Sequence, residues 1–167
     1  MTPDMPWSEG GLFLLTASFV ASLARIAFPA ARWLAPTAWW TLVLACAVLV
    51  ASLAIRSVEA GFFALTNMYE SLLTVAIGLL GATAVLERQA SPEQRAALPA
   101  FATMARMLAI GILLFAVGLP TEISPLQAAL RSYWRSIHVP IVLLSYALFA
   151  LSFVASSLYL LRARQHT

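Results

Sequence analysis

Long runs of apolar residues, separated by short polar connectors, dominate the pattern along this chain of 167 residues. Five runs can be distinguished, at about residues 10–28, 37–55, 68–86, 100–119 and 138–161. Each is close to the ~20 residues that a helix needs to cross the hydrocarbon of a bilayer. A membrane barrel would instead show short segments of alternating apolar and polar residues. The pattern therefore predicts an all-α integral membrane protein of about five transmembrane helices, forming a single domain over residues 1–167.

Composition supports a membrane location. Apolar residues make up 62% of the chain and charged residues 10%, against roughly 45–50% and about 25% in soluble domains. All ten basic residues are arginine, scattered singly between apolar runs, so the net charge of +3 does not indicate nucleic-acid binding. The single cysteine, Cys46, lies within an apolar run and is expected to be a packing residue. A signal peptide begins with a positively charged segment, but Asp4 and Glu9 occupy that region here, so the N-terminus is not expected to be a signal peptide.

The positions of the arginines predict an orientation. With the N-terminus outside, the inner side receives seven of them: Arg25, Arg32, Arg88, Arg95, Arg106, Arg162 and Arg164. The outer side receives three: Arg56, Arg131 and Arg135. The positive-inside rule therefore predicts an N-terminus outside and a C-terminus inside. Trp33, Trp39 and Trp40 then lie near the inner interface and Trp134 near the outer one. Arg106 is interpreted as an inner anchor whose side chain snorkels to the interface.

The first informative segment of the predicted outer face is residues 66–71, TNMYES, where the third helix begins. Asn67 is a favoured N-cap, and Glu70 three residues later completes a variant of the capping box. The Glu70 carboxylate also suits the positive end of the helix dipole, and a tyrosine such as Tyr69 is common at a membrane interface. Capping explains Asn67 and Glu70 without any function, so a structural and a functional role both stay open.

The second segment is residues 126–139, LQAALRSYWRSIHV. Its apolar residues recur at helical spacing, and two arginines lie off that stripe. This pattern predicts a short amphipathic helix on the outer interface, before the fifth transmembrane helix. It leads directly into His138, with Pro140 in a first turn, where proline is tolerated.

His138 shares one helix face with Ser145, Phe149, Ser152 and Ser156. One interpretation is a small-residue face for close helix packing, with His138 as an interfacial polar residue. The other is a neutral imidazole directed from the outer leaflet at a metal, above all haem iron. One histidine cannot fill both axial positions of a haem iron, so a second ligand would come from elsewhere.

The three predicted outer arginines, Arg56, Arg131 and Arg135, are candidates for pairing with haem propionates, because arginine matches carboxylate geometry. The alternative is that each is solvated or bound to lipid headgroups.

Two segments resemble the CcsA family, the membrane haem-handling subunit of system II cytochrome c biogenesis. Residues 66–72 read TNMYESL, which is similar to an element of that family. Residues 130–134 (LRSYW), 137–139 (IHV) and 145–147 (SYA) resemble the family element PALRSYWL-x-IHV … SYA. The order, the approximate spacing and the predicted outer location also agree.

The resemblance implies that haem b is presented on the outer face to an apocytochrome c, for thioether attachment to its Cys-x-x-Cys-His segment. It implies that His138 is an axial ligand of the haem iron. The implied haem surroundings are Tyr133, Trp134, Arg131 and Arg135, and the implied site-shaping residues are Asn67, Tyr69, Glu70 and Ser71. The implied partners are a CcsB/ResB-like subunit, apocytochrome c and a membrane protein that carries the family's Trp-rich segment. The implied location is the bacterial cytoplasmic (inner) membrane.

The chain also departs from the family pattern. The Trp-rich haem-binding segment and the later helices with further histidine ligands are absent, Ala128 replaces a proline, and Arg135 replaces a leucine. The resemblance therefore covers about the first half of a family member. We expect either one part of a split protein, belonging to a haem lyase or synthetase complex, or a shortened relative. Two alternatives stay open: a non-catalytic membrane scaffold that assists assembly, and a haem-binding electron-transfer subunit.

Overall fold

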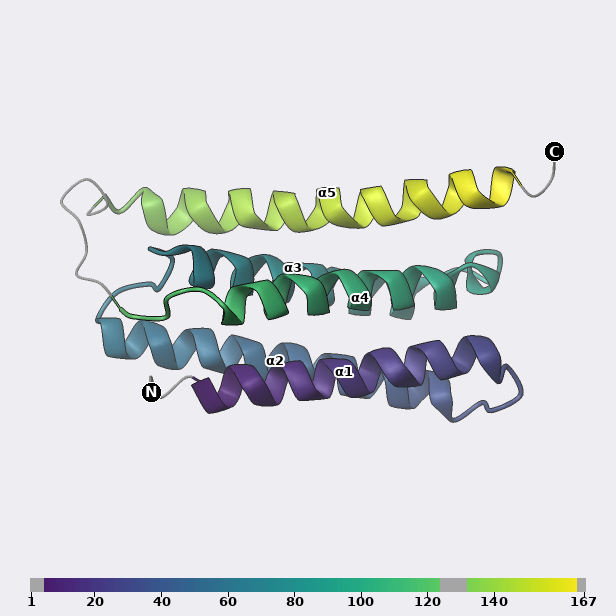
Figure 1. Ribbon diagram of the computed structural model, residues 1–167. Helices are drawn as coiled ribbons and strands as arrows, with labels where there is room; N and C mark the ends of the chain where they lie inside the picture. Colours follow the sequence, from purple (N-terminus) through teal and green to yellow (C-terminus); the bar gives the residue numbers. More distant parts are fainter. Residues whose placement is uncertain (1–4, 124–131, 165–167) are drawn as a thin grey trace.

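The computed structural model describes residues 5–123 and 132–164, and these residues form helices joined by turns (Figure 1). The helices are α1 (Met5–Ala27), α2 (Leu34–Ala60), α3 (Met68–Gln89), the short 3₁₀ helix η1 (Gln94–Ala96), α4 (Leu98–Val117) and α5 (Arg135–Ala163). The five α-helices are long and apolar enough to cross a membrane. The prediction of an all-α membrane protein with five spanning helices is thus confirmed.

The α-helices lie side by side and alternate in direction, so the bundle has two ends (Figure 1). We call the end where α2 and α4 finish and α3 and α5 begin the His138 end. The opposite end, where α1, α3 and α5 finish, is the arginine-rich end. Residues 126–131, the first part of the predicted amphipathic helix, lie outside the described residues. Residues 132–134 form a turn rather than a helix, and α5 begins at Arg135.

Leucine and alanine side chains fill the centre of the bundle. α1 packs most extensively on α2, while α3 contacts α2, α4 and α5. Fully buried core residues include Leu15, Leu42, Leu49, Leu73, Leu79, Leu80, Ala76, Ala105, Ala109 and Ala147. Small residues allow helices to approach closely in a bilayer. Gly78 of α3 is an example, because a Cβ placed there would lie 3.1 Å from the Cβ of Ala147 in α5.

Only one stripe of α5 is covered by the bundle. Leu143, Ala147, Leu151 and Val154 are buried, whereas Phe149 and Phe153 are largely exposed. The His138 side chain is exposed as well. The predicted face that runs from His138 through Phe149 to Ser156 therefore points mostly away from the other described helices.

The expectation that the Arg106 side chain snorkels to the inner interface is wrong. Its side chain is fully buried between helices rather than extended to the interface. Its guanidinium donates to Glu87 Oε2 at 2.6 Å, to Ser18 Oγ at 2.8 Å, and to the carbonyls of Ala102 and Ala38 at 3.0 and 3.3 Å. A carboxylate and three neutral acceptors satisfy the charge inside the bundle, so snorkelling is not needed.

Candidate functional site

The residues singled out in the sequence gather at the His138 end, in three segments: residues 61–67 between α2 and α3, the first turn of α3, and the first turn of α5. Gly61 ends α2 in the left-handed region, with φ of 71°, a conformation that glycine adopts without steric cost. The chain then turns back through residues 61–67 to the start of α3.

The Glu70 carboxylate organises this turn. It is fully buried, and its Oε2 accepts hydrogen bonds from Thr66 N at 2.6 Å, Thr66 Oγ1 at 3.1 Å and Asn67 N at 3.3 Å. In return, Asn67 Oδ1 accepts from Glu70 N at 2.9 Å. The capping box that the sequence predicts is therefore present. Ser71 extends the cap, because its hydroxyl donates to Asn67 O at 3.0 Å.

Arg56 supplies the countercharge, which the sequence did not predict. Its Nε donates to Glu70 Oε1 at 2.9 Å, and both side chains are shielded from solvent. Arg56 also donates to the carbonyl of Thr121, after α4, and lies 5.0 Å from the ring centre of Tyr69. The expectation that Arg56 is solvated or pairs with a haem propionate is wrong. The reason is that α2 continues to Ala60, past the predicted end at residue 55, so that Arg56 lies on the same buried stripe of α2 as Leu49 and Ser52.

Arg135 attaches the start of α5 to the same turn. Its Nη1 donates to the carbonyls of Phe63 and Leu65, each at 3.3 Å, and its guanidinium lies 5.9 Å from the ring centre of Phe62. Two carbonyls that precede the TNMYES segment thus accept from the first residue of α5. The first turn of α5 is consequently fixed relative to the first turn of α3.

His138 follows Arg135 by three residues, so both lie on neighbouring positions of the α5 surface. Its backbone N–H donates to Trp134 O at 2.9 Å, and its side chain is exposed. Tyr133 and Trp134 are also strongly exposed. Asn67, Glu70, Ser71 and Arg135 belong to one hydrogen-bonded network. The peptide group between Leu65 and Thr66 connects them, because its carbonyl accepts from Arg135 and its N–H donates to Glu70. The predicted haem neighbour Arg131 lies outside the described residues.

The chemistry of these groups fits part of a haem site. An accessible imidazole on the first turn of a membrane helix is a suitable axial ligand for haem iron. Exposed Trp134, Ile137 and Ile141 lie within one turn of it and can form part of an apolar wall. Within the described ranges, no group of three or more histidine, cysteine, aspartate or glutamate residues could hold a metal ion.

The fold and this end of the bundle define a multi-pass membrane protein with a hydrogen-bonded polar network around the turn between α2 and α3. The chain belongs to the family described as "Cytochrome C assembly protein", whose model matches residues 65–167. The match starts within the α2–α3 turn and includes α3, α4 and α5.

Individual relatives agree with this assignment. The cytochrome c biogenesis protein CcsA of Crocosphaera subtropica is 34% identical over 160 residues, covering 93% of this chain and 46% of that protein. The protein of the same name from Synechocystis sp. is 33% identical over 140 residues, covering 81% of this chain and 40% of the relative. The chain therefore spans less than half the length of these curated relatives. No solved structure matches it.

Proposed function

We propose that this chain is a membrane subunit of cytochrome c assembly, which helps to present haem b at the His138 end for attachment to apocytochrome c. Family membership and the names of the relatives support the general role. The observation that carries the specific proposal is the exposed imidazole of His138, one helical turn from Arg135, which is itself bonded to the turn before TNMYES.

In this proposal haem is the cargo, and its iron accepts the His138 imidazole as one axial ligand. Tyr133 and Trp134 contribute exposed aromatic surface beside the ligand. Arg131 is proposed to contact a propionate. Arg135 holds the first turn of α5 in place through two backbone carbonyls, so its main part is to position His138. Asn67, Tyr69, Glu70 and Ser71 shape the site indirectly, by fixing the turn that Arg135 binds.

The proposal includes the location and the partners. The protein lies in the bacterial cytoplasmic membrane, with the His138 end outside, consistent with the arginines gathered at the other end. A partner helix from a protein that carries the Trp-rich segment covers the face of α5 that runs from His138 to Ser156. Burying small polar side chains between helices is a common mode of association in membranes. A CcsB/ResB-like subunit and apocytochrome c complete the complex.

The test is the haem spectrum of the chain co-purified with its partner, in the wild type and in His138→Ala. We expect His138→Ala to lose haem or to shift its spectrum, and added imidazole to restore the wild-type spectrum. His166→Ala, which removes the other histidine, is the matched control and should leave haem unchanged. Equal haem spectra of wild type and His138→Ala would refute the ligand assignment.

A second candidate function is a non-catalytic scaffold. It is favoured by one observation: the polar atoms of Glu70 and Asn67 already serve the ion pair and the helix cap. If no haem is bound with or without the partner, and the partner still requires this chain to accumulate, the scaffold is the correct function.

A further inference from the structure

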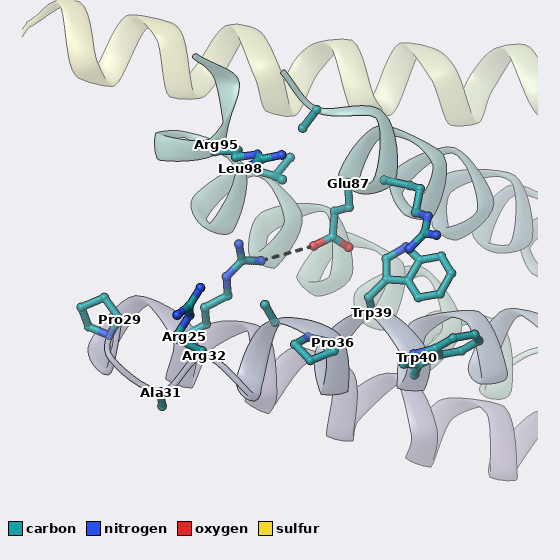
Figure 2. A pocket seen from close by; sticks show the side chains of 13 residues that line it. Arg25, Pro29, Ala31, Arg32, Pro36, Trp39, Trp40, Glu87, Arg95 and Leu98 are labelled. Carbon is teal, nitrogen blue, oxygen red and sulfur yellow. Dashed lines mark ion pairs between the residues drawn. The ribbon is translucent and has the colours of Figure 1, made fainter. Parts of the chain in front are cut away.

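A cavity of about 570 Å³ lies at the arginine-rich end, between the α1–α2 turn, the end of α3 and the segment before α4 (Figure 2). Four arginines line it, one or more from each of these places: Arg25, Arg32, Arg88 and Arg95. The indole rings of Trp39 and Trp40 form part of the same wall. Neither the capping network nor the proposed haem ligand involves any of these residues, since they lie at the other end of the bundle.

The cavity is strongly positive. Its lining holds four guanidinium groups and one carboxylate, that of Glu87, which gives a net charge of +3. Glu87 already accepts from buried Arg106 at 2.6 Å, and Arg25 approaches its other oxygen at 4.0 Å, as the dashed line in Figure 2 shows. In the part of the chain that the structure describes, no carboxylate pairs with the remaining three lining arginines.

Two apolar grooves adjoin this cavity. One, of about 390 Å³, runs between the ends of α3, α4 and α5 and shares Ala90 and Leu98 with the cavity. The other, of about 190 Å³, lies between α2 and α3 and shares Trp39 and Arg88 with it. Arg88 packs over the Trp39 ring, with its guanidinium 5.3 Å from the ring centre. The positive cavity therefore borders two apolar grooves and shares two lining residues with each of them.

We propose that this cavity binds the phosphate headgroup of an anionic glycerophospholipid, whose two acyl chains occupy the adjoining grooves. Guanidinium groups bind phosphate oxygens through paired N–H donors. Basic pockets between transmembrane helices are suited to anionic headgroups, and tryptophan favours the same interfacial depth. A zwitterionic lipid would bring a cationic choline towards four arginines, so the site discriminates by charge.

The test uses the full 167-residue chain in nanodiscs of phosphatidylcholine that contain a small fraction of phosphatidylglycerol with brominated acyl chains. Bromine quenches the fluorescence of Trp39 and Trp40 when the lipid occupies the site. We expect brominated phosphatidylglycerol to quench saturably at low mole fraction, and brominated phosphatidylcholine to quench only in proportion to its share of the lipid. This wild-type comparison tests the proposal without any substitution.

Substitutions locate the site. Arg32→Gln and Arg95→Gln each remove an exposed lining charge, and each should weaken phosphatidylglycerol binding about fivefold, the double variant about thirtyfold. Arg164→Gln removes a charge at the same end outside the cavity and should leave binding within about twofold. Far-ultraviolet circular dichroism checks that helicity is retained. Equal quenching by the two lipids, or an equal loss in Arg164→Gln, would overturn the proposal.

A final arm separates a lipid from a free anion. Inorganic phosphate is titrated into the chain in neutral-detergent micelles and into the lipid-loaded nanodiscs. Displacement of phosphatidylglycerol by millimolar phosphate, lost in Arg32→Gln and Arg95→Gln, would assign the cavity to a soluble phosphate and refute the lipid. No displacement, together with saturable lipid quenching, supports the headgroup site.

Discussion

Replacing Glu70 by glutamine tests the network at the His138 end most directly. The substitution preserves the shape of the side chain but removes the negative charge that faces the fully buried Arg56 guanidinium. Removing one member of a buried ion pair costs about 3–5 kcal/mol. In addition, the new side-chain amide has one acceptor oxygen where the carboxylate has two, so at least one donor among Thr66 N, Asn67 N and Arg56 loses its partner. We therefore expect a loss near the upper end of this range.

The assay is reversible unfolding in mixed micelles of mild detergent and dodecyl sulfate, followed by circular dichroism. Glu59→Gln is the matched control, because Glu59 is an exposed glutamate in the last turn of α2. Its free energy of unfolding should stay within about 0.5 kcal/mol of wild type. A protease-accessibility assay of residues 61–67 gives an independent measure, since Glu70 holds that turn through backbone N–H groups.

A double-mutant cycle with Arg56→Met separates the ion pair from the cap. Once Glu70 is neutral, removing the buried guanidinium should recover stability, so the double variant should be less destabilised than the sum of the single variants by about 2 kcal/mol or more. Additive single and double variants, or a Glu70→Gln loss below about 1 kcal/mol, would refute the conclusion that a buried charge pair stabilises this end.

Three further outcomes follow from the described contacts. Arg106→Leu should lower the free energy of unfolding by about 3–5 kcal/mol in the same assay. Arg106→Lys should recover only part of this loss, because an ammonium group cannot reach four acceptors at once. Full recovery of stability by lysine would contradict this geometry. Gly78→Val should loosen the packing of α5 on α3, because the new side chain overlaps Ala147, and should cost about 1–3 kcal/mol of stability. Disulfide cross-linking between engineered cysteines on α3 and α5 should then fall. Unchanged cross-linking would contradict the close approach of the two helices. Asn67→Ala should cost about 1 kcal/mol of stability and Asn67→Asp much less, as expected for an N-cap; equal losses would contradict capping.

The sequence predicts the fold well because apolar runs of membrane-spanning length report directly on helices in lipid. It also predicts the cap at Asn67 and Glu70, since capping depends on residues three positions apart. The partners of buried charges are harder to predict. Arg56 and Glu70 are separated by 14 positions, and hydropathy alone ends the second helix before Arg56.

Arg106 offered a usable signal that hydropathy obscured. An arginine within an apolar stretch generally requires a polar partner, and Glu87 lies at the predicted inner end of the preceding helix. The connection between them spans a short loop, so the pair could have been proposed from the sequence. The contact of Arg135 with the carbonyls of Phe63 and Leu65 had no such signal, because backbone acceptors carry no sequence pattern.

The two buried ion pairs carry a consequence for biosynthesis, because α3 provides both carboxylates. At one of its ends Glu70 pairs with Arg56 of the preceding helix, and at the other Glu87 pairs with Arg106 of the following helix. A nascent α2 that entered lipid alone would carry an unneutralised guanidinium, as would α4 if it arrived before α3. Membrane insertion of each arginine is therefore coupled to the arrival of α3, which makes this helix the one on which the order of assembly depends.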